Sequence, residues 1–209
     1  MELRDWFGIC PLIAILRGIT PGEVDATLHQ LWDAGIRMAE IPLNSPEPIE
    51  GISRAVHGFG DKMLIGGGTV MSPSQVQEVY AVGARLIVTP HAQSAIVREA
   101  KQLGMFALPG VATATEAFSV LEAGADGVKI FPAEIAGPRI VPALRAVLPR
   151  GTLIVPVGGV DENSITTWKA SGADGYGIGS SLYKPGRTAF EVGATARHFV
   201  KLLNRSKGR

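Results

Sequence analysis

The sequence lacks the features that mark several large classes of protein. Cys10 is the only cysteine among 209 residues, so the chain forms no internal disulfide and no cysteine-based metal cluster. Its 20 basic and 19 acidic residues leave a net charge of +1, which favours neither a nucleic acid nor a membrane surface as partner. No apolar run approaches the roughly 18 residues of a membrane span, and the N-terminus shows no signal-peptide core. These absences predict a cytoplasmic protein.

Signatures of metal and cofactor enzymes are also missing. The four histidines, His29, His57, His91 and His198, are isolated, and no carboxylate–histidine spacing indicates a metal site. The run Gly66-Gly67-Gly68 is not a dinucleotide fingerprint, and neither a Walker loop nor a Ser-His-Asp set is present. We therefore expect no metal and no cofactor, and local groups have to bind any acidic ligand.

Glycine is abundant, and its positions form a pattern. Many of the 26 glycines stand where a helix-like stretch gives way to an apolar one, because a helix often ends on a glycine at positive φ. Eight strand-like stretches emerge, at 11–16, 38–43, 63–67, 86–89, 105–109, 126–131, 152–157 and 174–178. Strands that alternate with single helices predict one α/β domain over residues 1–209, closed as a (β/α)8 TIM barrel. An open doubly wound sheet is the alternative.

The same pattern predicts where helices begin. Pro21, Pro46, Pro73 and Pro138 stand where a first helical turn would start, and Asp161 is typical of an N-cap. Residues 1–8 predict a short helix over the bottom of the barrel. The active site of such a barrel lies at the C-terminal ends of its strands, so polar residues there are the candidates.

Two charged residues lie inside apolar strands. Alternation puts Val128 and Ile130 on one face of their strand and turns Lys129 into the barrel, and it turns Glu40 inward in the same way. Burial favours the neutral, nucleophilic form of a lysine. An inward lysine and an inward glutamate supply a nucleophile and a proton shuttle, whereas the alternative is a structural ion pair between them.

Anion-binding groups are expected at three strand ends. Arg17 ends the first strand, and arginine binds carboxylates in a bidentate fork, although a surface arginine that caps a helix is the alternative. Gly158-Gly159 and Gly179-Ser180 close the last two strands, where barrels commonly bind phosphate through backbone N–H groups. Tight turns that need glycine are the alternative for these pairs.

Six segments in this order resemble the KDPG/KHG aldolase family. They are 13–18 (IAILRG), 40–45 (EIPLNS), 67–70 (GGTV), 88–90 (VTP), 129–132 (KIFP) and 157–160 (VGGV). The resemblance covers about residues 11–183. It implies a (β/α)8 fold, a homotrimer, no metal, and reversible cleavage of a phosphorylated 2-keto-3-deoxy sugar acid to pyruvate and D-glyceraldehyde 3-phosphate.

The resemblance also implies roles for individual residues. It assigns the Schiff base to Lys129 and the proton shuttle to Glu40. The other site residues that it implies are Arg17 and Thr69 around the pyruvate portion, Thr89, Pro90, Phe131 and Val157 in the substrate pocket, and Gly158, Gly159, Gly179 and Ser180 at the phosphate.

Two departures separate the chain from gluconate-type members of the family. Asn44-Ser45 replaces the usual Arg-Thr, and Val157 replaces a threonine whose hydroxyl lies near the C4 oxygen of the substrate. An unpaired polar group costs about 1–3 kcal/mol, which is enough to alter the preference between C4 epimers. Both departures match the galactonate type, so we expect 2-dehydro-3-deoxy-6-phosphogalactonate as substrate, with its gluconate epimer as the alternative. His91 stands where we expect an asparagine.

Two other classes of function fit parts of the pattern. A phosphosugar isomerase or epimerase on the same barrel would use Glu40 as a base without covalent chemistry. A non-catalytic phosphosugar-binding module would keep the barrel and have no turnover, although the presence of both Lys129 and Glu40 argues against it.

Overall fold

Strands and helices alternate along the chain in the computed structural model, which describes residues 1–204. The strands are β1 (Leu12–Ile15), β2 (Met38–Pro42), β3 (Leu64–Gly68), β4 (Leu86–Val88), β5 (Phe106–Leu108), β6 (Gly110–Val111), β7 (Gly127–Ile130), β8 (Leu153–Pro156) and β9 (Tyr176–Ile178). The helices are α1 (Leu3–Ile9), α2 (Pro21–Asp33), α3 (Pro48–Phe59), α4 (Pro73–Ala81), α5 (Ser94–Gln102), α6 (Ala114–Glu122), α7 (Ala133–Ala136), α8 (Ile140–Arg145), α9 (Ile165–Ala170) and α10 (Ala189–Asn204).

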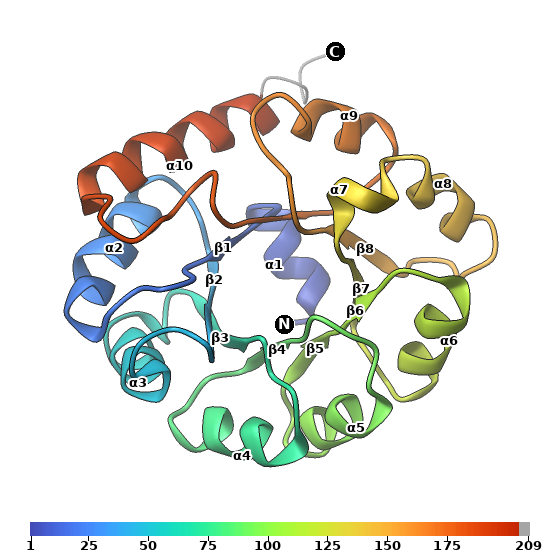
Figure 1. Cartoon of the computed structure of the whole chain (residues 1–209), viewed down its shortest axis with the longest axis horizontal. Helices are drawn as coiled ribbons and strands as arrows, with labels where there is room; N and C mark the ends of the chain where they lie inside the picture. The colour runs from blue at the N-terminus through green and yellow to red at the C-terminus, as the bar shows by residue number, and fades with distance from the viewer. Residues whose placement is uncertain (205–209) are drawn as a thin grey trace.

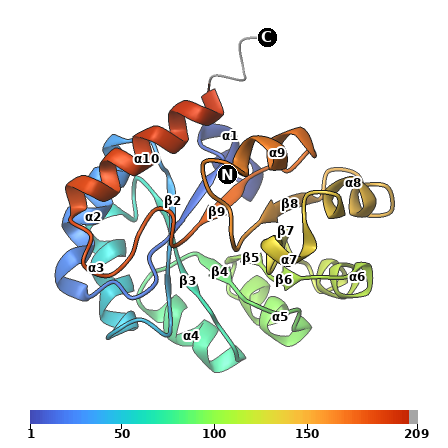
Figure 2. The same ribbon diagram turned by 45° about the horizontal axis from the view of Figure 1, so that its top comes forward.

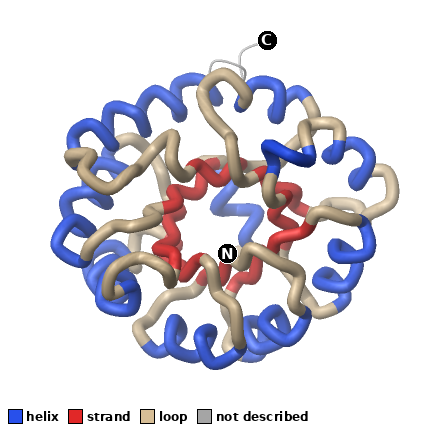
Figure 3. The backbone as a smooth tube through the Cα atoms, viewed as in Figure 1, coloured by secondary structure: helices blue, strands red, loops and turns tan. Residues whose placement is uncertain are grey.

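The strands form two parallel sheets in an α/β fold. One has the order β5-β4-β3-β2-β1-β9 and the other the order β6-β7-β8. The strands lie around a common centre and most of the helices lie outside them, whereas α1 lies across the centre (Figure 3). The stretch expected as a strand at 105–109 is divided differently, because Pro109 separates β5 from β6 and proline has no N–H to donate to a ladder. At the other border, Val157 and Gly177 form an isolated parallel bridge.

Helices α10 and α2 lie side by side, so the end of the described chain returns to its beginning (Figure 1, Figure 2).

Two helices begin at the expected prolines, Pro21 and Pro73. The expected N-terminal helix is present as α1. Within residues 1–204, no helix is both long and apolar enough to cross a membrane.

Two other helix starts were predicted at the wrong proline. Helix α3 begins at Pro48 and not at Pro46, because Glu47 stands before it in the left-handed region with φ of 41° and serves as the N-cap. Helix α8 begins at Ile140, and Pro138 lies in the preceding turn. In both cases the sequence places a proline near a helix start without fixing which residue takes the first helical position.

Asp161 does not cap a helix directly. Its carboxylate accepts hydrogen bonds from the backbone N–H groups of Asn163 and Ser164 at 3.0 and 2.8 Å. The residues after it form a turn, and α9 begins only at Ile165 with Ser164 as its N-cap. The expected capping interaction therefore stabilises the turn that leads into α9.

Most of the glycines between a helix and the following strand adopt the positive φ expected at the end of a helix. Gly124 and Gly172, for example, have φ of 98° and 90°, a region that other residues adopt only with strain. Gly60 is an exception, because it remains in the right-handed helical region with φ of −57°.

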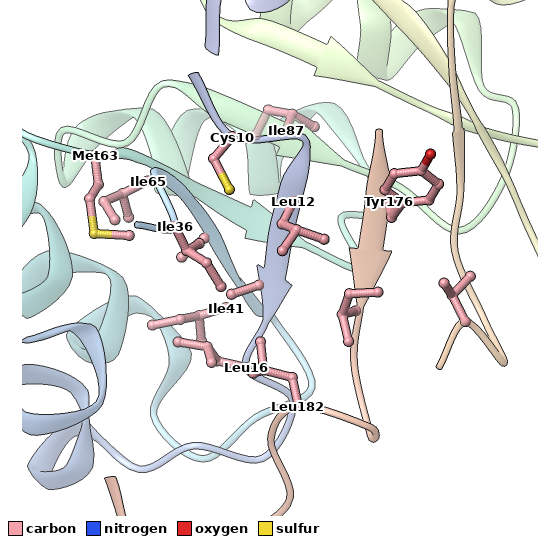
Figure 4. Close-up of a cluster of buried hydrophobic side chains, with 14 of the residues drawn as sticks. Cys10, Leu12, Leu16, Ile36, Ile41, Met63, Ile65, Ile87, Tyr176 and Leu182 are labelled. Carbon is pink, nitrogen blue, oxygen red and sulfur yellow. The ribbon is translucent and has the colours of Figure 1, made fainter. Parts of the chain in front are cut away.

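Buried apolar side chains form two layers, one on each face of the strands. The outer layer lies between strands and helices, and Figure 4 shows part of it, including Leu12, Ile41 and Tyr176. The inner layer fills the centre and includes alternate strand residues. These are Ile13, Ile15, Met38, Leu64, Leu86, Val88, Leu108, Leu153 and Val155, and Val157 joins them just after β8.

Helix α1 covers one end of the inner layer. Its Leu3 and Phe7 belong to that layer, and Phe7 lies so close to Gly175 that a Cβ there would stand 2.2 Å from the ring. Because Gly175 directly precedes β9, this contact places α1 at the N-terminal ends of the strands. The opposite end, where the strands finish, is the one left for a site.

Candidate active site

Lys129 and Glu40 project from β7 and β2 into the centre of the molecule. Only 4% of Lys129 and 2% of Glu40 are exposed. Val128 and Ile130 belong to the outer apolar layer, so alternation turns Lys129 to the inner face, as the sequence predicts. Among residues 1–204, no carboxylate lies within 4.0 Å of the Lys129 ammonium group, so a tight structural ion pair with Glu40 is absent.

Burial changes the acidity of both groups. It lowers the pKa of Lys129 to about 8, assisted by the positive charge of Arg17 and opposed by Glu40. It raises the pKa of Glu40 to about 7, opposed by the charges of Lys129 and Arg17. Both pKa values thus lie near neutral pH, which suits a nucleophilic amine together with a proton shuttle.

One oxygen of the Glu40 carboxyl group is available for chemistry. Glu40 Oε2 is buried and has no hydrogen-bond partner among residues 1–204. It lies against Gly68 at the end of β3, where a Cβ would stand 1.8 Å from it. The last glycine of the run in β3 thus makes room for this carboxyl group. An unpaired buried carboxyl oxygen is costly unless a ligand satisfies it.

Arg17 is held at the C-terminal ends of β1, β2 and β3. Its guanidinium group donates to Asn44 Oδ1, and its second terminal nitrogen donates to Thr69 Oγ1 at 3.3 Å. The backbone N–H of Gly18 donates to Ser45 Oγ at 2.9 Å. Asn44-Ser45, which distinguishes the chain from the gluconate-type pattern, therefore fixes Arg17 and Gly18. The sequence shows that Asn44-Ser45 departs from the gluconate-type pattern, but it does not predict that these residues bind Arg17 and Gly18.

A cavity of about 420 Å³ opens between the ends of β1, β8 and β9. It brings together seven of the residues that the sequence predicts, and its wall also contains residues that sequence reasoning missed. The predicted residues in the wall are Arg17, Phe131, Val157, Gly158, Gly159, Gly179 and Ser180. The others are Ile15, Gly18, Val160, Gly177, Tyr183, Lys184 and Pro185.

Phe131 links the cavity to the buried lysine. The Lys129 Nζ atom stands 4.5 Å from the centroid of the Phe131 ring, and that ring lines the cavity. The cavity wall is largely apolar except at Arg17, Lys184, Ser180 and the loop backbones. A small molecule that binds there is therefore oriented by a few polar groups next to a desolvated amine.

The glycine pair of the β8 loop has two structural requirements. Gly158 and Gly159 have φ of 100° and 67°. A Cβ on Gly159 would stand 2.4 Å from Glu134 Oε2 of α7. Turn geometry thus explains these glycines by itself, and the same geometry lets the backbone line the cavity with Gly179 and Ser180. The structure therefore fits both a phosphate-binding role and a purely structural turn for these loops.

Thr89 and Pro90 do not line the cavity. The Thr89 hydroxyl donates to the His91 carbonyl at 2.5 Å and accepts from the Gly110 N–H at 3.3 Å, so its hydrogen bonds go to the backbone. His91 forms a hydrogen bond with Gln93 through Nε2 at 3.0 Å, and its buried Nδ1 has no hydrogen-bond partner in the described part of the chain. The role of Thr89 and Pro90 in the pocket wall stays a prediction.

The described residues show no metal site of ordinary composition. In residues 1–204, no group of three or more histidine, cysteine, aspartate or glutamate side chains is arranged to hold an ion. The chemistry that the site can perform with its own residues is addition of the Lys129 amine to a carbonyl carbon, with Glu40 moving protons.

One family model and several known proteins are similar to this chain. The model, described as KDPG and KHG aldolase, matches residues 7–190. The 2-dehydro-3-deoxy-6-phosphogalactonate aldolase of Escherichia coli (strain K12) is 47% identical over 196 residues, which are 94% of this chain and 96% of that protein. A solved structure described as native KDPGal has a TM-score of 0.93 at 46% identity, over 95% of this chain and 97% of that one. A cube-shaped cage designed by fusing symmetric oligomeric domains has a TM-score of 0.92 at 46% identity, over 94% of this chain and 73% of that one.

Proposed function

The chain belongs to the KDPG and KHG aldolase family, and we propose that it cleaves 2-dehydro-3-deoxy-6-phosphogalactonate reversibly to pyruvate and D-glyceraldehyde 3-phosphate through a Schiff base on Lys129. The observation that carries the mechanism is a buried lysine whose pKa is lowered to about 8, beside a buried glutamate. Support for the galactonate epimer comes from the name of the Escherichia coli relative and from Asn44-Ser45 and Val157.

The reaction uses the two buried groups in turn. In the cleavage direction, the neutral Lys129 amine adds to the C2 ketone, and the carbinolamine loses water to form a protonated Schiff base. The C3–C4 bond then breaks as Glu40 takes the proton of the C4 hydroxyl: C4 leaves as the aldehyde and the electron pair moves to C3 as an enamine. Protonation of C3 and hydrolysis of the new Schiff base release pyruvate and restore the amine.

The remaining residues orient the substrate. Arg17 is held by Asn44 and Thr69 and binds the substrate carboxylate beside the Schiff base. Its guanidinium group has five N–H donors, so donors remain for the carboxylate after these two contacts. Phe131 and Val157 form the apolar wall, and the backbone at Gly158, Gly159 and Gly179, with Ser180, receives the phosphate. No cofactor is needed for these steps.

The pH dependence of turnover follows from the two coupled groups. The reactive pair holds one proton in total, and that state is populated between the pKa values of about 7 and about 8. Below this window both groups are protonated and the amine is not nucleophilic; above it neither retains a proton to donate. We expect a bell-shaped profile of kcat/KM with its maximum between these values, measured by pyruvate release from about pH 5 to 10. A rate that keeps rising through the alkaline range would contradict this assignment.

The C4 configuration of the product tests the substrate assignment. Incubation of pyruvate and D-glyceraldehyde 3-phosphate with the enzyme is expected to give mainly the galactonate epimer, as determined by NMR. In Val157→Thr, a hydroxyl near C4 is expected to raise the ratio of the gluconate to the galactonate epimer about 5- to 150-fold, since satisfying one polar group is worth about 1–3 kcal/mol. Mainly the gluconate epimer from the unaltered enzyme would instead identify a KDPG aldolase.

The fold and assembly are proposed in finer detail as well. We infer that the two sheets form one closed (β/α)8 barrel and that residues 1–209 are a single domain. Residues 205–209 of this domain lie outside the described part of the chain. Support comes from the hydrogen bond of 2.8 Å from the Lys129 N–H to the Pro109 carbonyl and from the Val157–Gly177 bridge. A homotrimer agrees with the family resemblance and with the symmetric oligomeric domains of the similar cage protein. The cytoplasmic location stays a prediction.

A further inference from the structure

The wall of the substrate cavity contains a second cationic side chain besides Arg17. Among the described residues that line the cavity, Arg17 and Lys184 are the two with charged side chains. Resting on the function proposed above, we propose that Lys184 binds the phosphate group of the substrate and sets the preference for phosphorylated over unphosphorylated substrates. The cavity wall beside it contains Ser180 and the backbone of Gly158, Gly159 and Gly179.

The backbone of Lys184 is held in place on both sides. The hydroxyl of Tyr183 donates to Glu23 Oε1 at 3.4 Å, which ties the segment to α2. Pro185 packs against Gly18 so closely that a Cβ on Gly18 would stand 2.8 Å from the proline ring. The Lys184 carbonyl accepts from the Arg187 N–H at 3.1 Å. These contacts keep the Cα of Lys184 at the edge of the cavity.

The side chain of Lys184 is free, in contrast to its backbone. It is exposed and makes no ion pair or side-chain hydrogen bond among residues 1–204. Other lysines of this chain are engaged: Lys101 pairs with Asp126 at 2.7 Å, and Lys169 donates to the Leu203 carbonyl at 2.8 Å. Lys184 can therefore turn its ammonium group to a bound anion without breaking an existing contact.

The charges around the cavity favour this role for Lys184. Arg17 is bound to Asn44 and Thr69 at the ends of β2 and β3, where it serves the end of the substrate next to the Schiff base. The carboxylate of Glu134 lies against Gly159 and repels an incoming phosphate. With a net charge of only +1, the chain offers no general attraction for a dianion. The exposed ammonium group of Lys184 in the wall of the same cavity offsets this repulsion.

The test compares two acceptor aldehydes in the synthetic direction. With pyruvate as donor, kcat/KM is measured for D-glyceraldehyde 3-phosphate and for D-glyceraldehyde, and their ratio gives the phosphate preference. We expect Lys184→Met to lower this ratio about two- to fivefold, the effect of losing one charge pair at an exposed site. Lys184→Arg is expected to keep most of the ratio. Added salt is expected to lower the wild-type ratio and to have less effect on Lys184→Met, because salt screens exposed charges.

Lys201→Met is the matched control, since it removes the same charge from an exposed position on α10 away from the cavity wall. It is expected to keep the wild-type ratio. A Lys184→Met enzyme with the wild-type ratio and the wild-type salt dependence overturns this inference alone. A wild-type enzyme that forms no aldol product from either aldehyde removes the proposed function, and this inference with it.

Discussion

Lys129→Met is expected to abolish turnover while the fold survives. The reaction needs an amine that bonds covalently to C2, and methionine has none, so kcat/KM for cleavage should fall by at least about 10⁴-fold. The methionine side chain has nearly the length of lysine and is apolar, and the lysine is 4% exposed, so the replacement also removes the cost of burying an amine. We therefore expect a thermal unfolding midpoint equal to or above that of the unaltered protein, measured beside pyruvate release.

The matched control is Lys62→Met, which changes an exposed lysine near Phe59 and is expected to keep full activity. Substantial cleavage by folded Lys129→Met would rule out the covalent mechanism. Proton exchange or isomerisation of a phosphosugar by that variant would instead support the isomerase alternative, in which Glu40 acts without the lysine.

Glu40→Gln is expected to cause the second largest loss, a decrease in kcat of about 10²- to 10⁴-fold, the usual contribution of a general acid–base group. The amide has the same shape, so the close contact with Gly68 is kept. The pKa of Lys129 should fall further, because the carboxylate that raises it is gone. The amine thus remains nucleophilic while the proton transfers fail. Exchange of the pyruvate methyl protons in D₂O, followed by NMR, should slow by a similar factor, since enamine formation needs the base.

Glu50→Gln is the control for this change, because Glu50 is exposed on α3 and forms an ion pair with Arg54 on the same helix. It should leave the exchange rate unchanged. Wild-type exchange in Glu40→Gln would show that another group moves the proton. Gly68→Ala offers a second check: its Cβ would displace the Glu40 carboxyl group, so activity should fall in the same direction even though both reacting groups are still present.

The sequence alone predicts that the side chains of Lys129 and Glu40 point toward the centre of the fold. Strand alternation fixes the face of every second residue, so Lys129 and Glu40 follow from the apolar neighbours on either side of them. The helix-ending glycines were predictable for a similar local reason, because positive φ is accessible mainly to glycine. These inferences use one element at a time, which is why they need no tertiary information.

Contacts between loops could not be predicted in this way. The bond from Arg17 to Asn44 joins residues far apart in the chain, and it depends on how the ends of β1 and β2 meet. The engagement of Thr89 with the backbone of Gly110 depends on the break at Pro109. Lys184 stands after the last strand with no local pattern to mark it. In each case the information lies in the packing of different elements.

The central claim is that the Lys129 amine bonds covalently to a keto acid, and reductive trapping tests it most directly. The protein is incubated with pyruvate and sodium borohydride, digested, and mapped by peptide mass spectrometry. We predict one reduced pyruvate adduct, on the peptide that contains Lys129, together with loss of activity in proportion to labelling. Inactivation without an adduct, or an adduct on another lysine while Lys129 stays unmodified, would contradict the mechanism.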